Sequence, residues 1–152
     1  MSTLYEQLSK DTIEALKGRD NVRLSVLRLL KAAIKNAAIA KQKGEDMLSN
    51  DEVLELVRYE LKKRREAVRM YRQAAREDSA AAEEQEAAVL EGYLPPQRSS
   101  ADLGSIVAGV IAQTPEPAKN QGRIIGAVMA RVRGQADGAA VKRIVEEMIA
   151  QR

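Results

Sequence analysis

Residues 50–75 (NDEVLELVRYELKKRREAVRMYRQAA) carry apolar side chains at intervals of three and four, interrupted only by Arg64. The side chains that keep this spacing are Leu54, Val57, Leu61, Val68, Tyr71 and Ala75. Residues three and four apart lie on one face of an α-helix, so the pattern predicts one long helix with a single apolar face. Ser49 and Glu52 form the capping box expected at its start.

The amino-acid composition favours an all-α fold built around this helix. The 152 residues include no Phe, Trp, Cys or His. The core must therefore consist of Leu, Ile, Val, Met and Ala, which suit close helix packing better than sheets. Without Cys and His the chain has no disulfide, zinc thiolate or thiol nucleophile, and lacks the usual general base.

No motif for stand-alone chemistry is visible. The sequence has no GxxxxGK[ST] phosphate loop, and a Ser-His-Asp triad is impossible without His. Glu83, Glu84 and Glu86 crowd the start of one expected helix, where acids more often offset the helix dipole than bind metal. We therefore expect no catalytic residues, no metal and no cofactor.

Nothing in the sequence points to a membrane. No run of about 20 apolar residues is present, and the start MSTLYEQLSK lacks the apolar core of a signal peptide. The expectation is a cytoplasmic protein without a membrane partner.

Local signals divide the chain into two helical parts. Further helices are expected over residues 3–17, 21–41, 79–91, 101–113, 121–133 and 138–152. Expected start signals are Asp20, Asp78 or Ser79, Ser99 or Ser100, Asn120 or Gln121, and Asp137. Expected end signals are Gly18, Gly44 and Gly92. The prolines of Leu94-Pro95-Pro96 prevent helix continuation. We predict an N-terminal helical domain (1–92), a hinge (93–97) in which Tyr93 and Leu94 dock against a neighbour, and a C-terminal three-helix domain (98–152).

Small residues recur every four positions in the segment 119–138 (KNQGRIIGAVMARVRGQADG). They are Gly122, Gly126, Ala130 and Gly134. Ile125, Val128, Met129 and Val132 are expected to fill an apolar side of the same helix. The small stripe has two interpretations: a close crossing with another helix of the bundle, or a close approach by a phosphate backbone.

Cations gather in two regions. Residues 58–76 carry eight bases against two acids, and residues 119–152 carry seven against three. In the long helix the bases form a ridge beside the apolar face, which consists of Arg58, Lys62, Arg65, Arg69, Arg72 and Arg76. One interpretation is a solvated face that pairs with acids such as those of residues 83–86, and the other is a set of phosphate contacts.

Three stretches resemble the YqeY proteins of the GatB/YqeY family. They are residues 22–40 (VRLSVLRLLKAAIKNAAIA), the E-x-E-x-x-x-L-x-G-Y-L-P-P-Q pattern from Glu84 to Gln97, and Gly126-Ala127-Val128-Met129 followed by GQADG at 134–138. The resemblance implies a helical N-terminal domain and a C-terminal domain similar to the tail of the B subunit of tRNA-dependent amidotransferase. That tail contacts tRNA in a carbon–nitrogen ligase that uses glutamine as amido-nitrogen donor. The catalytic domains of such an enzyme have no room in this chain.

The functional hypothesis is an accessory module that binds tRNA or another structured RNA by shape and charge, since stacking aromatics are scarce. The candidate contacts in the C-terminal part are Lys119, Gly122, Arg123, Gly126, Arg131, Arg133, Lys142 and Arg143. The candidates in the long helix are Arg58, Lys62, Arg65 and Arg69. Two alternatives stay open: a subunit of an amidotransferase or aminoacyl-tRNA synthetase complex, and a protein-binding adaptor that uses the long helix.

Overall fold

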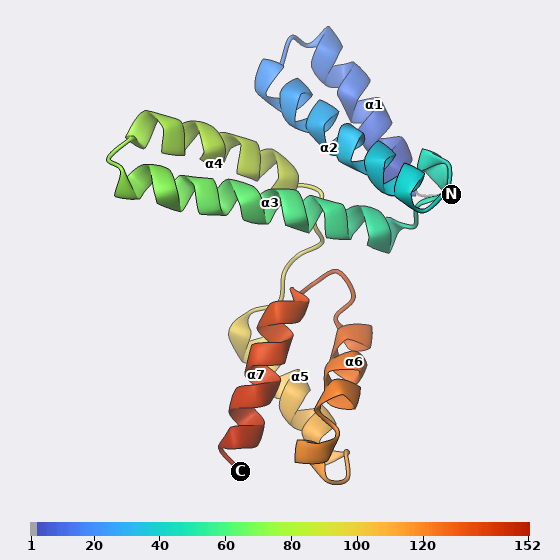
Figure 1. Ribbon diagram of the computed structural model, residues 1–152, viewed down its shortest axis with the longest axis vertical. Coiled ribbons are helices and arrows are strands. Elements are labelled where there is room, and N and C mark those ends of the chain that lie inside the picture. Colours follow the sequence, from blue (N-terminus) through green and yellow to red (C-terminus); the bar gives the residue numbers. More distant parts are fainter. Residues whose placement is uncertain (1–2) are drawn as a thin grey trace. The chain divides into compact units, whose positions relative to one another are not determined.

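The fold is all-helical, as expected from the sequence. The computed structural model describes residues 3–152, and in this range it contains seven α-helices, two short 3-10 helices and no strand (Figure 1). The elements are α1 (Thr3–Lys17), α2 (Asn21–Ala40), η1 (Glu45–Met47), α3 (Asn50–Gln73), α4 (Glu77–Glu91), α5 (Ser100–Ala112), η2 (Pro117–Lys119), α6 (Gln121–Arg131) and α7 (Gly138–Ala150). None of these helices combines the length and apolar character needed to cross a bilayer.

The chain forms two compact units, each with its own apolar core. The first unit ends at Leu94 and the second runs from Pro95 to Arg152. The predicted hinge over residues 93–97 stays a prediction.

In the first unit α1 and α2 form one antiparallel helix pair and α3 and α4 form another (Figure 1). The largest fully buried side chains of this unit include Leu8, Leu27, Leu30, Ile34, Leu48, Val57 and Leu90. The apolar face of α3 differs slightly from the predicted one, because Val53 is buried where Leu54 is only half-buried. Ala75 lies beyond the end of α3 and is exposed.

Side-chain caps begin several helices where the sequence predicts them. The Asp20 carboxylate accepts from the backbone N–H of Arg23 at 3.1 Å. The Ser49 hydroxyl accepts from the N–H of Glu52 at 3.1 Å, and the Glu52 carboxylate accepts from the N–H of Ser49 at 2.8 Å, which completes the capping box. The caps of α5 and α7 are Ser99 and Asp137. The expected start of α4 at Asp78 or Ser79 is wrong, because the helix begins at Glu77 and has no side-chain cap.

Three helices of the first unit, α1, α2 and α3, end on left-handed residues that are not glycine, whereas α4 ends at the expected Gly92, which has a right-handed φ of −61°. Arg19, Gln42 and Ala75 have φ values of 56°, 54° and 55°. In each case the next N–H reaches back to a carbonyl of the last turn: Asp20 N to Ala15 O (3.0 Å), Lys43 N to Ala38 O (2.9 Å) and Arg76 N to Tyr71 O (2.8 Å). The expected terminators Gly18 and Gly44 therefore flank these turns and do not take the left-handed position.

The second unit packs α5, α6 and α7 around a small aliphatic core. Its fully buried side chains are Val107, Ile124, Val128, Val132, Val141 and Val145. Ile124 was missing from the predicted apolar side of α6, whereas the predicted Ile125 and Met129 are only half-buried. Gly134 (φ 72°) lies in the turn after α6, so it does not extend the small-residue stripe along the helix.

Candidate functional site

The outward surface of α6 is made only of small residues and arginines. Its exposed residues are Gly122, Arg123, Gly126, Ala127, Ala130 and Arg131. Beyond the adjacent residues and the backbone of its own helical turns, a Cβ atom added to Gly122 or Gly126 would meet no atom of the described chain within 4 Å. These glycines therefore make no room for a crossing helix in residues 3–152, and the interpretation as an internal helix crossing is wrong for them.

Four arginines of the second unit, two of them on this surface of α6, are free to meet an anion. Arg123, Arg131, Arg133 and Arg143 are exposed and form no ion pair with any residue between positions 3 and 152. Arg123 and Arg131 are eight positions apart on α6, which corresponds to a rise of about 12 Å. A polyanion that lies along α6 can therefore contact one arginine near each end of the helix.

Two further cations of the second unit are held only by weak local pairs. The Lys119 ammonium lies 2.7 Å from the Glu116 carboxylate, and both side chains are more than two-thirds exposed. The Lys142 ammonium lies 4.0 Å from the Glu146 carboxylate, also at the surface. Exposed pairs of this kind contribute about 0–1 kcal/mol, so a phosphate can replace the carboxylate at little cost.

The start of α6 lacks a side-chain cap. The Asn120 side-chain amide instead donates to the carbonyls of Pro115 (2.9 Å) and Glu116 (3.2 Å). The first backbone N–H groups of the helix are therefore uncapped, and they carry the partial positive charge of a helix N-terminus. This end of the helix adds to the positive character that Lys119 and Arg123 give the surface.

The turn that carries Arg133 is braced by residues from the start of the unit. The Gln97 side-chain amide donates to the Gly134 carbonyl at 3.0 Å. The Arg98 backbone N–H donates to the Gln135 carbonyl at 2.7 Å, and the Arg98 guanidinium donates to the Gln135 side chain at 2.8 Å. The sequence did not indicate this structural role of Arg98, because its hydrogen-bond partner Gln135 lies 37 positions away in the chain.

In the first unit the cationic ridge of α3 is partly neutralised by α4. Arg65 lies 2.9 Å from Glu91, and Arg72 lies 2.5 Å from Glu84 and 3.3 Å from Glu77. The pairing interpretation is thus confirmed for these two arginines.

The remaining ridge candidates divide by exposure. Arg58 is half-buried, and its Nη2 is buried without a hydrogen-bond partner in the described chain. Lys62 and Arg69 are exposed and form no ion pair within residues 3–152. The ridge is therefore a weaker candidate surface than α6.

A buried carboxylate organises the segment before the prolines. Asp11 is 5% exposed, and it accepts hydrogen bonds from the Tyr93 hydroxyl at 2.5 Å and the Gln7 amide at 2.7 Å. The Arg23 guanidinium lies 3.3 Å from the same carboxylate. Burial, and then the hydrogen bond to Asp11, raise the pKa of Tyr93 to about 12. Tyr93 thus docks against its own unit, as the sequence predicted, although its partner Asp11 was not foreseen.

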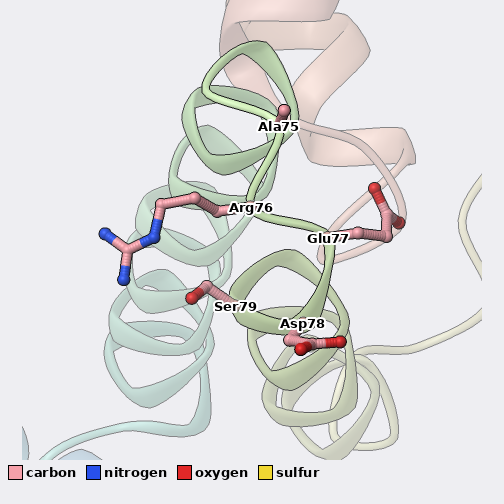
Figure 2. A pocket seen from close by; sticks show the side chains of 5 residues that line it. All are labelled: Ala75, Arg76, Glu77, Asp78 and Ser79. Carbon is pink, nitrogen blue, oxygen red and sulfur yellow. The ribbon is translucent and has the colours of Figure 1, made fainter.

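A surface hollow of about 400 Å³ surrounds the turn between α3 and α4. Figure 2 shows that Arg76 points away from Glu77 and Asp78, so the side chains do not converge on a common point. The Arg76 guanidinium lies 5.3 Å from the centre of the Tyr71 ring. The hollow therefore shows no arrangement that would hold a ligand.

Comparisons with known proteins match nearly the whole chain. A family model described as Yqey-like protein covers residues 5–149. A protein of Pyrenophora tritici-repentis (strain Pt-1C-BFP), named altered inheritance of mitochondria protein 41, mitochondrial, is 22% identical over 151 residues. The match spans 97% of this chain and 82% of that relative.

Proposed function

Since the chain belongs to the family of Yqey-like proteins, we propose that it is an accessory module whose second unit binds the phosphate backbone of tRNA or another structured RNA. The observation that carries this proposal is the outward surface of α6, where every exposed residue is Gly, Ala or Arg. Small residues let a backbone come close, and the arginines supply charge-assisted contacts to phosphate. Acids are absent from α6 altogether, so nothing on this helix repels a polyanion.

The chemistry of the surface favours recognition by shape and charge. Residues 95–152 contain no aromatic residue on which a base can stack. Contacts to phosphate and sugar suit a folded RNA with closely spaced backbones, of which tRNA is one. Such binding releases counterions and therefore weakens as salt rises.

The resemblance to the tail of the amidotransferase B subunit supports tRNA as the RNA, and the family motifs Gly126–Met129 and Gly134–Gly138 coincide with α6 and its following turn. We place the chain beside an amidotransferase or aminoacyl-tRNA synthetase, as a tRNA-contacting subunit without its own active site. Amidation of misacylated tRNA by a reconstituted amidotransferase should then speed up when the chain is added. An unchanged rate refutes this placement but leaves RNA binding intact.

The direct test compares the full chain with an Arg123→Ala/Arg131→Ala variant. Anisotropy of a fluorescent tRNA is followed across a series of salt concentrations. Loss of two phosphate contacts should reduce the slope of log affinity against log salt by about 1.4–1.8. The control is Arg65→Ala/Arg72→Ala, which removes the same charge from arginines already paired with acids of α4. Equal affinity of wild type and the α6 variant at every salt concentration refutes the proposal.

A further inference from the structure

The outward face of α2 is uncharged over most of its length. The residues that follow each other on this face at intervals of three and four are Val22, Ser25, Leu29, Ala32, Asn36 and Ile39, and all six are exposed. Leu29 and Ile39 are 51% and 64% exposed. A helix that only faces water carries charged residues on its outer side, so an apolar and small-residue strip of this kind marks an interaction surface.

The strip leads into a hollow between the helices of the first unit. Leu29 lines a surface cavity of about 350 Å³ together with Ala67 of α3. Met70, one turn further along α3, is 65% exposed. A side chain of a partner that lies along α2 can therefore enter this recess and contact its two apolar lining residues, Leu29 and Ala67.

The charges around this face select the kind of partner. Arg28 and Lys35, which border one side of the strip, are exposed and form no ion pair in the described part of the chain. The recess on the other side is also lined by two ion pairs, Glu60 with Lys63 (2.8 Å) and Arg64 with Glu83 (3.4 Å). Because each acid is paired with a base, this side carries no net charge that would attract the phosphates of RNA or of a lipid surface, and it suits a protein of mixed charge.

We propose that α2 docks an amphipathic helix of a partner protein, with apolar residues spaced three and four apart and Asp or Glu along one edge. Ser25 and Ala32 allow the two helix axes to come close, and the acidic edge of the partner meets Arg28 and Lys35. A second copy of this chain fits less well, because a symmetric α2–α2 contact brings these cations against each other. This interaction is separate from the RNA surface on α6.

The test uses a synthetic three-heptad helix with Leu at the contact positions and Glu at the flanking positions, and a counterpart with Lys in place of Glu. Binding to the full chain is measured by fluorescence anisotropy. The acidic peptide should bind at least tenfold more tightly, and Arg28→Glu/Lys35→Glu should reverse the preference. Equal binding of the two peptides, or no binding, overturns the proposal.

A matched pair of variants locates the contact. Leu29→Asp should weaken binding of the acidic peptide at least tenfold, whereas Ile13→Asp on α1, where Ile13 is 53% exposed, should leave it unchanged. Both variants keep the unfolding midpoint of the parent, because neither side chain belongs to the buried core. Equal losses in the two variants overturn the proposal. Binding of anionic vesicles or self-association that Leu29→Asp abolishes assigns the face to a membrane or to a second copy, and also overturns it.

Discussion

Replacement of Gly126 by alanine should change stability and RNA binding in opposite directions. Gly126 lies inside α6, and an added Cβ atom meets nothing within 4 Å. Alanine is favoured over glycine in a helix interior by about 1 kcal/mol, and no clash offsets this gain. For a unit of this size, 1 kcal/mol corresponds to a rise in Tm of about 4–8 °C, which calorimetry of the full chain resolves.

The same methyl group should weaken the binding of tRNA. If a phosphate backbone approaches α6 at Gly126, the methyl displaces it from Arg123 and Arg131. An affinity loss of about tenfold, or about 1.4 kcal/mol, is expected for such a misplacement. The fluorescent tRNA titration measures it at a fixed salt concentration.

Gly109→Ala is the matched control for this experiment. Gly109 lies in α5 of the same unit, is exposed, and also has open space around an added Cβ atom. Residues 99–118 contain no Lys or Arg, so this variant should gain stability without losing affinity for RNA. If Gly126→Ala binds tRNA as tightly as Gly109→Ala does, the argument from close backbone approach is wrong. A lower Tm for Gly126→Ala would contradict the open surroundings of the glycine.

Two further predictions concern the first unit. Tyr93→Phe removes a hydrogen bond to the buried Asp11 carboxylate and should lower the free energy of unfolding by about 1.5–3 kcal/mol in urea titrations. The raised pKa of Tyr93 means that the folded protein holds the phenolic proton more tightly than the unfolded chain does. The contribution of Tyr93 to the free energy of unfolding is therefore fully present below about pH 10 and is lost as pH rises towards 12. The decline of stability over this range should be smaller in Tyr93→Phe. The hydrogen bond from Lys41, followed by that from the Ser49 N–H, lowers the pKa of Glu52 to about 2, so its contribution is present above about pH 4.5 and is lost as pH falls towards 2. Glu52→Gln should flatten the acid limb of a stability–pH curve, and an unchanged limb contradicts the assignment.

Local chemistry made much of the helix pattern predictable. Asp20, Ser49 and Asp137 cap the helices that follow them, because a side-chain oxygen two or three residues before a free N–H is enough to form the cap. The left-handed positions at Arg19 and Gln42 were not predictable in this way. Glycine adopts that conformation most easily, but here the last-turn hydrogen bonds hold two other residue types in it.

The cations of the candidate site were visible in the sequence, but their availability was not. Arg65 and Lys62 are both exposed on the same ridge. Arg65 forms an ion pair with Glu91 of α4, whereas Lys62 forms no ion pair within residues 3–152. Such pairing depends on the length and direction of side chains on two packed helices. The exposure of Gly126 likewise required the packing of α6, since the sequence fits an internal crossing equally well.

The hydrogen bond between Gln97 and the turn after α6 lets an uncharged residue influence the position of a positive charge. Gln97 carries no charge, yet its side-chain amide and the backbone N–H of Arg98 bind the carbonyls of Gly134 and Gln135, which follow Arg133 in the chain. The electrostatic field of the second unit therefore depends on uncharged residues as well as on the number of lysines and arginines. A substitution of Gln97 that preserves every cation can still redirect that field, because it removes a hydrogen bond to the backbone of the turn.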